Sequence, residues 1–544
     1  KINVVVETPK SSKLGDISIP VFSVVKVLRR PLSEIVNIVS DILSSSKYKN
    51  FFSEINNVSG FINIKLNRLE ISKTVINNFS KEDDYGSNVI GKGKTVVIDY
   101  SSPNIAKPFS VGHLRSTVIG HAISNILEKL GYEVYRINHL GDFGTQFGKI
   151  IYAYLNFGDK QKVKENPIDE LVKLYVKFHK LAKDNPEIED KSRKIFKELE
   201  QKNPKYVELW EYFREVSLKE YMKVYDLLGV EFDSYDGEAF YNDKMDSVVK
   251  ELKDKGLLQK DQGAMIVDLG EKYPPALIQK RDGSTLYITR DLAALFYRKR
   301  TYNFDEALYV VGNEQKLHFD QLKAVVKKMG YEYYRDIHHI NFGLVLQEGK
   351  KMSTREGKVV KLIDVLNEAS KLSLEYINEK NPDLDNKEEI AKKVGVSAII
   401  FNDLKNYRAN DIDFNLKDMV NFVGQTGPYL QYTSVRISSI LQDNQIDQNS
   451  VDYNYYIDDY SYEVIKKIDE YKEILLNAKL EYAPSILAKY LLTLASHFNS
   501  YYSQEKVMVN DLIERNSKLY LISAVRYILD DGMKLLGMKV IKKM

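Results

Sequence analysis

A succession of strand, loop, helix and strand in the first third of the chain constrains its fold more than any other feature. Residues 95–100 have the apolar content of a buried strand, and a polar loop, Ser101–Val111, follows them. From Gly112 apolar residues recur at every fourth position, which predicts one face of a helix. Gly131 is well placed to end this helix, and 133–137 has the pattern of a second strand. This order predicts the opening unit of a parallel, nucleotide-binding sheet.

The rest of the sequence predicts two further domains. A chain of 544 residues exceeds what one hydrophobic core usually accommodates. Residues 1–85 are predicted to form a small N-terminal α+β domain, because amphipathic segments precede a run of strand period at 61–66. Residues 86–370 are predicted to form the α/β domain, a Rossmann-like parallel sheet with a helical insertion at about 151–230. Residues 371–544 are predicted to be all-helical.

Strand signals return after the insertion and then stop. Apolar runs at 264–267, 307–311 and 342–346 predict further strands. After about residue 370 no strand signal is found, and amphipathic helical periods continue to Met544. The strands are therefore expected to end before the last domain begins.

The composition excludes several kinds of site. There is no cysteine, which rules out disulfides, thiolate zinc sites, iron–sulfur clusters and a cysteine nucleophile. No run of about 18 apolar residues is present and the start is not a signal peptide, so we expect a cytoplasmic protein without a membrane span. Lys and Arg (79) nearly balance Asp and Glu (76), which argues against a histone-like binder of any duplex. A local basic surface for nucleic acid remains compatible with this balance.

The loop between the first strand and the first helix is the most informative part of the sequence. Free backbone N–H groups and the helix dipole converge at such a place, which favours an anionic phosphate. Gly112 lets a flat base approach the backbone, His113 can donate a hydrogen bond to a phosphate, and Lys107 adds a mobile cation. Taken singly, His113 is more simply a residue of the helix terminus and Lys107 a solvated charge. Their combination at this position favours the phosphate site.

A second loop, Gln347–Gly357, combines glycines with a cluster of lysines and an arginine. Such a mobile, cationic segment suits a triphosphate whose charge shifts toward its β–γ bridge during reaction. In isolation, an ordinary basic surface loop is the simpler interpretation of this segment.

Two other motif matches are discarded. Gly86-x4-Gly91-Lys92-Gly93 resembles a P-loop, but it precedes a strand and lacks the serine or threonine that holds magnesium. Asp142-Phe143-Gly144 matches the metal-binding triplet of kinases, but no His-Arg-Asp loop accompanies it.

Together the two informative loops resemble the signature motifs of class I aminoacyl-tRNA synthetases, His-x-Gly-His and Lys-Met-Ser-Lys-Ser. The residues within and around these motifs resemble those of the arginyl-tRNA synthetases. The matching segments are Ser101–Pro108 leading into Gly112–Thr117, then Gly141–Gly148, Lys351–Arg355 and Gly427–Tyr432. The resemblance covers essentially the whole chain, with the motifs in the family's order.

The resemblance implies an enzyme that activates L-arginine with ATP and loads it onto tRNA, with Mg²⁺ carried by the ATP and no metal site of its own. Lys107, His113 and Lys351 are then the catalytic residues that stabilise charge on the phosphates. The residues expected to bind ATP are Ser110, Gly112, His113, Val345, Lys351, Met352 and Ser353. The family generally activates arginine only with tRNA bound, and we expect the same here, from a monomer.

An arginine pocket must hold a planar cation that cannot lose its proton, so it needs buried carboxylates. By resemblance, the residues that bind arginine are Glu238, Tyr287 and Asp291 at the guanidinium and Ser102, Asn104 and Gln315 at the amino and carboxyl groups. Tyr287 and Asp291 are four apart, so on a helical turn they share a face. From spacing alone, Asp291 is equally well a helix N-cap and Glu238 a solvated turn residue. Such a pocket discriminates without an editing domain, so the helical insertion is expected to be structural.

Two positions depart from the family's pattern. The family usually has a histidine where this chain has Ser110, and a serine keeps a hydrogen-bonding group but loses the ring and its charge. The second motif has Thr354 in place of its second lysine. This is common in the family, where the lysine just before the first motif is thought to compensate, and here that lysine is Lys107.

Contacts with tRNA follow from the same resemblance. They are Phe61 and Asn63 at the elbow, Asn499 and Tyr502 in the anticodon-binding helical domain, and Met544 at a buried terminus. The 38 Tyr and 22 Phe supply stacking surfaces for unpaired bases, although most are expected in the core. Phe61 and Asn63 are equally well ordinary strand residues.

Two alternatives stay open at this point. A synthetase-like protein that binds nucleotide or RNA without catalysis is supported by Ser110 alone, and the three intact cationic positions argue against it. A class I enzyme for another amino acid, such as cysteine, would need thiolates for its zinc site, and the chain has none.

Overall fold

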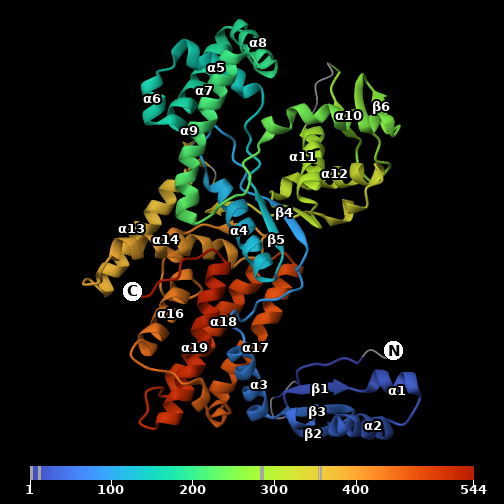
Figure 1. Ribbon diagram of the computed structural model, residues 1–544, viewed down its shortest axis with the longest axis vertical. Coiled ribbons are helices and arrows are strands. Elements are labelled where there is room, and N and C mark those ends of the chain that lie inside the picture. Colours follow the sequence, from blue (N-terminus) through green and yellow to red (C-terminus); the bar gives the residue numbers. More distant parts are fainter. Residues whose placement is uncertain (1–3, 10, 12–13, 282–286, 353, 356–357) are drawn as a thin grey trace. The chain divides into compact units, whose positions relative to one another are not determined.

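The computed structural model describes residues 4–9, 11, 14–281, 287–352, 354–355 and 358–544 (Figure 1). The chain divides into two compact units. The smaller unit comprises Lys1–Tyr85, Arg436–Lys472 and Thr493–Leu529. The larger unit comprises Gly86–Val435, Glu473–Leu492 and Asp530–Met544. Residues 371–544, predicted as one helical domain, contribute to both units.

Four parallel strands form the main sheet of the larger unit, in the order β10-β9-β4-β5. Their bounds are β4 Thr95–Asp99, β5 Glu133–Ile137, β9 Glu306–Tyr309 and β10 Ile337–His339. β4 lies between two neighbours, and its residues 96–98 are at most 1% exposed, which explains why this run is continuously apolar. The predicted Rossmann-like parallel sheet is confirmed.

The helix predicted after the first strand is present, with a 3₁₀ turn before it. The turn η3 spans Val111–His113 and the helix α4 spans Leu114–Lys129, so the α-helix begins later than predicted. Gly131 has a φ of +87° and follows the end of the helix, as predicted. A Cβ on Gly120, within α4, would lie 2.3 Å from the ring of Tyr100. Only glycine therefore allows α4 to pack this closely on the end of β4.

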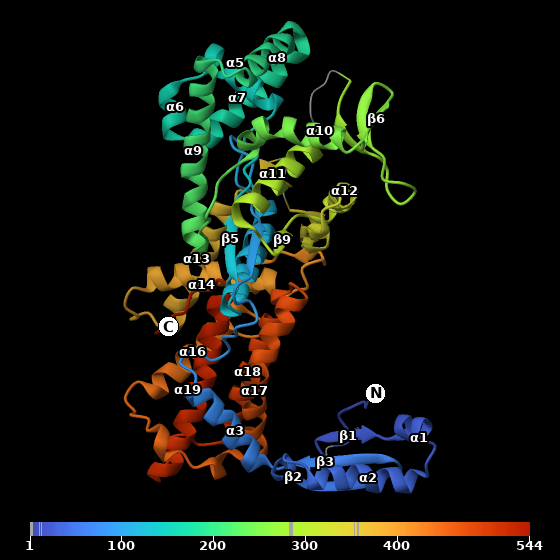
Figure 2. The same ribbon diagram turned by 45° about the vertical axis from the view of Figure 1, so that its right-hand side comes forward.

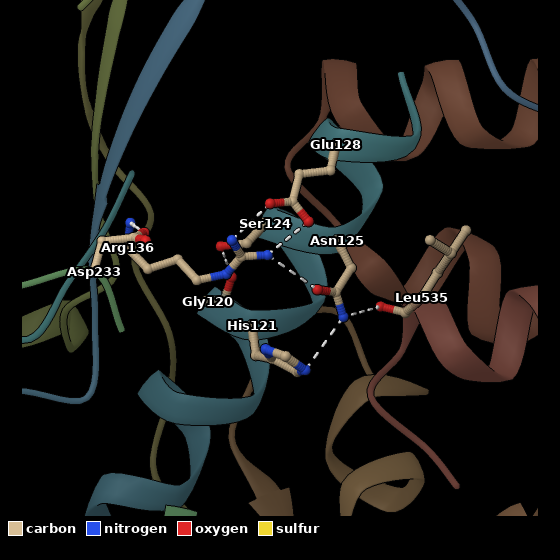
Figure 3. A network of polar contacts seen from close by, with 8 residues as sticks. All are labelled: Gly120, His121, Ser124, Asn125, Glu128, Arg136, Asp233 and Leu535. Atoms are coloured by element: carbon tan, nitrogen blue, oxygen red, sulfur yellow. Dashed lines mark hydrogen bonds and ion pairs between the residues drawn. The ribbon is translucent and has the colours of Figure 1, made fainter. Parts of the chain in front are cut away.

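Polar contacts fix α4 to its neighbours (Figure 3). Arg136 of β5 bonds Glu128 at 2.6 Å and Asn125 at 3.3 Å. Asn125 in turn donates to the carbonyl oxygen of Leu535 at 3.3 Å, at the end of helix α19 (Leu512–Leu535). The backbone N–H of Arg136 donates to Asp233 at 2.7 Å. The helix that carries the first motif is thus held both to the sheet and to the C-terminal part of the chain.

The predicted helical insertion is a bundle that follows β5 (Figures 1 and 2). Its helices are α5 Thr145–Phe157, α6 Lys160–Glu165, α7 Pro167–Asp184, α8 Glu187–Glu200 and α9 Pro204–Leu228. The first helix, α5, begins at Thr145, before the start of the insertion predicted at about residue 151. Asn203 caps α9 by accepting from the backbone N–H of Lys205, and Gly229, with a φ of +69°, ends it.

Three smaller sheets correct the strand predictions. The run at 264–267 is a strand, but it lies in an antiparallel sheet of β6 Leu258–Asp261, β7 Ala264–Val267 and β8 Ala276–Gln279. The strand predicted at 342–346 begins too early in the sequence. The strand β11 is Val345–Gln347, and it pairs with β12 Lys350–Lys351 and with β15 Ile412–Asp413, outside the parallel sheet. The short strand β15 also shows that the expectation of no strands after 370 was wrong. β13 Thr354–Arg355 and β14 Lys358–Val359 form a further antiparallel pair.

The remaining elements are mainly helical. Besides η3, the described 3₁₀ turns that follow β4 are η4 Glu238–Lys244, η5 Asn313–Gln315, η6 Glu332–Asp336, η7 Gln448–Ser450 and η8 Tyr453–Tyr456. The helices are α10 Met245–Asp254, α11 Tyr287–Tyr302, α12 Lys316–Lys328, α13 Leu362–Lys380, α14 Lys387–Leu404, α15 Leu416–Met419, α16 Gly427–Leu441, α17 Asp459–Leu480 and α18 Pro484–Gln504. Among the described residues, no helix combines the length and apolar character that crossing a membrane requires.

The N-terminal part of the smaller unit has the predicted α+β character. Its antiparallel sheet has the order β1-β3-β2. The elements are β1 Ile17–Pro20, α1 Phe22–Leu28, α2 Leu32–Ser45, η2 Lys49–Phe51, β2 Phe52–Val58, β3 Phe61–Leu66 and α3 Arg68–Ser80. The predicted strand at 61–66 is β3. Its Ile62 and Ile64 are at most 2% exposed and pack with Ile35 of α2 in a small core.

Candidate active site

The loops that leave the carboxyl ends of β4, β5 and β9 form the candidate site, as expected for an open parallel sheet. A parallel bridge joins Asn104, after β4, to Gly141, after β5. A second parallel bridge joins Gly312, after β9, to Phe342. Ser102 and Asn104 therefore lie at the same edge of the sheet as Gln315, which ends the turn η5 and is exposed.

The first loop is held in shape by the long insertion helix α9. Within this loop, Ser102 and Ala106 have φ of +47° and +58°, so the loop backbone turns sharply. The hydroxyl of Tyr221, on α9, lies 2.6 Å from the carbonyl oxygens of both Asn104 and Lys107, and its one hydrogen can be donated to either of them. Ser217, one turn earlier, accepts from the N–H of Ala106 at 2.9 Å. These bonds give the insertion a structural role at the site.

Ser110 and His113 close the end of this loop. Ser110 is the N-cap of η3, and Nδ1 of His113 lies 3.1 Å from the backbone nitrogen of Ser110. A backbone N–H only donates, so in the neutral ring Nδ1 accepts and the proton resides on Nε2. Burial lowers the pKa of His113 and Lys107 reinforces this, while the backbone carbonyl of Ser110, 3.3 Å from Nδ1, opposes it by favouring the protonated ring. His113 is thus a neutral residue whose Nε2–H is available as a donor.

The residues around the second motif are described in part. Val345 is buried, and its carbonyl accepts from the N–H of Met352 at 2.9 Å. Lys351 is exposed on β12, while Met352 is 6% exposed. Ser353 lies outside the described residues. Lys107 and Gly112 are also exposed. The residues predicted to bind ATP therefore include lysines that face solvent and apolar side chains, Val345 and Met352, that are buried.

The segment directly after the second motif is joined to the first loop. The N–H of Val111 donates to the carbonyl of Val360 at 3.1 Å, and the N–H of Leu362 donates to Phe109 at 2.9 Å. Lys361, between them, pairs with Asp169 of the insertion helix α7 at 2.7 Å. The first loop is therefore tied through the backbone to the segment that follows the second loop.

Glu238 and Asp291 lie close enough to influence each other. Glu238 is the first residue of η4, and its side chain is 18% exposed. Burial raises the pKa of Glu238 to about 7, Arg290 opposes this rise, and Asp142 and Asp291 add to it. Nη1 of Arg290 lies 3.7 Å from Oε2 of Glu238. The interpretation of Glu238 as a solvated turn residue is wrong, because this acid is desolvated and faces an internal cation.

Asp291 is positioned by a histidine that the sequence did not reveal. It is the fifth residue of α11, so the N-cap interpretation is wrong. Its Oδ2 lies 2.5 Å from Nε2 of His318 on α12. Tyr287 is the first residue of α11, so it lies on the same helix as Asp291, as their spacing predicted. Its side chain is 69% exposed. Tyr287 is thus mostly open to solvent.

A buried ion pair below the first loop was also missed. Nη1 of Arg298 lies 2.8 Å from Oδ2 of Asp99, the last residue of β4, and both side chains are nearly inaccessible. Ser102 donates to the other carboxylate oxygen of Asp99 at 3.0 Å. Nη2 of Arg298 lies 3.2 Å from Nδ1 of His139. An acid at the carboxyl end of a buried strand could have been singled out in the sequence, but its distant partners could not.

Known proteins of one family match this chain over its whole length. The family model described as tRNA synthetases class I (R), catalytic domain, matches residues 74–416. A DALR anticodon binding domain matches 430–544, and an arginyl tRNA synthetase N terminal domain matches 1–66. The chain belongs to the class I arginyl-tRNA synthetase family. An arginine–tRNA ligase of Enterococcus faecalis is 49% identical over all of this chain and 96% of its own length.

Solved structures agree with this arginyl-tRNA synthetase assignment. An arginyl-tRNA synthetase of Plasmodium falciparum has a TM-score of 0.82 and 26% identity, with 100% of this chain and 95% of that chain covered. The fold of a Thermus thermophilus arginyl-tRNA synthetase, at 24% identity, also aligns with a TM-score of 0.82 over 99% and 96% of the two chains. The predicted fold class is confirmed.

The side chains predicted to contact tRNA differ in accessibility. Asn63 is 3% exposed in the middle strand of its sheet, which counts against direct contact with RNA. Phe61 is half-buried and packs edge-on against Phe22. Tyr502 and Asn499 are half-buried on α18, and the guanidinium of Arg436 lies 4.3 Å from the Tyr502 ring centroid. Met544 packs beside a small apolar cluster, and its carbonyl accepts from Asn381.

Proposed function

We propose that this chain activates L-arginine with ATP and transfers the arginyl group to the terminal adenosine of tRNA. The observation that carries the proposal is the desolvated Glu238, influenced by Asp291, at the carboxyl edge of a class I synthetase sheet. A desolvated acid is the group that a permanently charged guanidinium requires.

In the first step an oxygen of the arginine carboxylate attacks the α-phosphorus of ATP. The bond between that phosphorus and the bridging oxygen breaks, and pyrophosphate leaves with the electron pair. We infer that Lys107, Lys351 and the Nε2–H of His113 stabilise the charge on the phosphates. Mg²⁺ would arrive with the triphosphate, whose oxygens supply ligands that this ion prefers. Ser110, Gly112, Val345, Met352 and Ser353 complete the proposed ATP site.

The amino acid is proposed to lie along the sheet edge. Glu238 and Asp291, with Tyr287 at the rim, take the guanidinium. Ser102, Asn104 and Gln315 take the amino and carboxyl groups. In the second step a hydroxyl of the terminal ribose, the 2′ position for this class, attacks the carbonyl carbon of the adenylate and AMP leaves. Phe61, Asn499 and Tyr502 are the residues proposed to contact tRNA, through stacking and hydrogen bonds.

We further propose that the enzyme is a cytoplasmic monomer and that arginine activation requires bound tRNA. One assay tests the proposed function: exchange of pyrophosphate into ATP, measured with each amino acid and with or without total tRNA. Exchange with arginine and tRNA only is the expected result. Full exchange without tRNA would contradict the tRNA requirement, and exchange with a different amino acid would overturn the substrate. No exchange with any amino acid would favour a nucleotide- or RNA-binding protein.

A further inference from the structure

The segment Gly141–Asp142, which follows β5, touches both ends of the proposed arginine pocket. At one end Gly141 lies against the first loop. Its N–H donates to the carbonyl of Pro103 at 3.1 Å, and its own carbonyl accepts from Ile105 at 3.2 Å. A Cβ on Gly141 would come within 2.0 Å of the side-chain oxygen of Asn104. The position of the Asn104 amide therefore depends on the absence of a side chain at 141.

At the other end Asp142 holds the start of η4. Its Oδ1 accepts from the N–H of Ala239 at 2.9 Å. The neighbouring N–H of Glu238 donates to the carbonyl of Leu140 at 2.9 Å. A Cβ on Gly237 would lie 2.5 Å from the Asp142 carboxylate, so the backbone at Gly237 packs directly on the Asp142 side chain. Glu238 is thus held at its own N–H by Leu140 and at the next N–H by Asp142.

Two residues of the insertion helix α9, Arg214 and Trp210, hold Asp142 in place. Nε of Arg214 lies 3.1 Å from Oδ2 of Asp142, and Nη2 of Arg214 donates to Tyr235 at 2.8 Å. The indole N–H of Trp210 donates to the carbonyl of Asp142 at 2.6 Å. Asp142 itself is 1% exposed. Both carboxylate oxygens already have partners, so Asp142 does not bind the substrate itself. It holds the backbone of η4, and its charge adds to the rise in the pKa of Glu238.

We propose that Gly141–Asp142, braced by Arg214 of the insertion, sets the spacing between Asn104 and Glu238 and so selects an amino acid of arginine's length. Asp142 is a positioning residue for Glu238. This inference rests on the proposed function, because it takes Asn104 and Glu238 as the two ends of the arginine site. It gives the insertion a part in substrate specificity in addition to its support of the first loop.

The test compares Asp142→Asn with the parent enzyme for arginine, for ATP and for L-homoarginine, which is one methylene longer. Asparagine can still accept from Ala239, but it loses the charge that holds Arg214. The KM for arginine is expected to rise about tenfold or more, as when a charged hydrogen bond is weakened. The KM for ATP should stay within about twofold, and the preference for arginine over homoarginine should fall. A general loss of structure would lower kcat and change both KM values together.

Trp210 supplies a readout that does not depend on turnover. It is the only tryptophan of the chain. It also lines a pocket of about 570 Å³, together with Asp142, Phe143 and Arg214. Titration of Trp210 emission with arginine gives a dissociation constant for each variant in the presence of tRNA, and this constant should shift with the KM.

Two further variants keep the test decisive if Asp142→Asn fails to fold. Arg214→Met should raise the KM for arginine, and Arg214→Lys should restore part of the loss. Arg193→Met, which breaks an exposed pair with Asp190 in the same insertion, is the matched control and should leave both KM values unchanged.

Glu238→Gln distinguishes failure of this inference from failure of the proposed function. The inference is overturned if Glu238→Gln raises the KM for arginine while Asp142→Asn and Arg214→Met leave it within about twofold of the parent. If Glu238→Gln itself leaves arginine binding unchanged, the guanidinium site of the proposed function fails, and this inference fails with it.

Discussion

The backbone N–H of Ser110 donates to Nδ1 of His113, and this bond directs the proton of the imidazole to Nε2. The distance between the two nitrogens is 3.1 Å. The bond uses the main chain, so it does not depend on which side chain stands at position 110. A histidine, which the family usually has here, could therefore replace Ser110 without changing the tautomer of His113.

We predict that Ser110→His keeps the aminoacylation rate within about tenfold of the parent, because the neighbouring cations dominate phosphate stabilisation. Ser110→Ala removes the capping hydroxyl and should cost about 1 kcal/mol of stability with a similarly small effect on rate. Steady-state aminoacylation and chemical denaturation measure the two effects. A change far above tenfold in either direction for Ser110→His would mean that this side chain contacts substrate directly.

Arginine binding should depend on pH through Glu238. Burial raises its pKa to about 7, so below this pH the acid is largely protonated and cannot pair with a guanidinium. The apparent affinity for arginine should then weaken about tenfold for each pH unit below the pKa and level off above it. The test is to measure the KM for arginine between about pH 5.5 and 8.5. The KM for ATP, measured at each pH, is the control. A KM for arginine that is flat across pH 7 would show that Glu238 does not bind the substrate's cation.

The sequence predicted the parts of the fold that local patterns determine. The run at 95–100, the helix after Gly112 and the strand at 133–137 each carry their own periodicity and turn residues, and β4, α4 and β5 follow them closely. The strand at 342–346 was misplaced because its pairing decides its position. β11 takes its register from the two-residue strand β15, and two residues have no period to detect.

The candidate site divides in the same way. Lys107, Gly112 and His113 could be named because they share one loop. The partners Arg290 for Glu238, His318 for Asp291 and Arg298 for Asp99 come from elements separated in sequence by at least 27 residues. Their pairing arises only when the sheet edge assembles, so no local signal announces it. The support of the first loop by α9 was hidden for the same reason.

A buried ion pair links the first-motif helix to the helices that follow the second motif. Nε of Arg115 lies 3.2 Å from Oδ2 of Asp403, and both side chains are 1% exposed. Burial raises the pKa of Asp403 even though Arg115 opposes the rise, so desolvation outweighs the attraction between the charges. Arg115→Met alone should therefore destabilise the fold by about 3–5 kcal/mol, because it leaves an unpaired buried acid.

The double variant Arg115→Met with Asp403→Leu should recover most of that stability, since no buried charge remains. Urea unfolding of the parent, both single variants and the double variant gives the coupling energy. Lys129→Met, at the far end of the same helix, breaks a less buried pair with Asp531 and should cost clearly less. A double variant as unstable as Arg115→Met would mean that Arg115 stabilises the fold mainly through its bond to the carbonyl of Asn410.

Tyr502 should contribute to tRNA binding through its ring. The ring is half-buried on α18, with Arg436 at 4.3 Å from its centroid and Phe498 at 5.8 Å. Loss of a stacking surface for one base typically costs ~1–3 kcal/mol, so Tyr502→Ala should raise the KM for tRNA by about tenfold. Tyr502→Phe keeps the ring and should stay close to the parent. The KM values for arginine and ATP should not change in either variant.

The matched control for this prediction is Tyr460→Ala, at a 43% exposed tyrosine of the same unit. If Tyr460→Ala weakens tRNA binding as much as Tyr502→Ala, the effect is one of general surface aromatics and not of the proposed anticodon-facing helix. If Tyr502→Ala and Tyr502→Phe weaken it equally, the hydroxyl carries the contact, and recognition at this position proceeds through a hydrogen bond instead of stacking. Only a loss confined to Tyr502→Ala places a base against this ring.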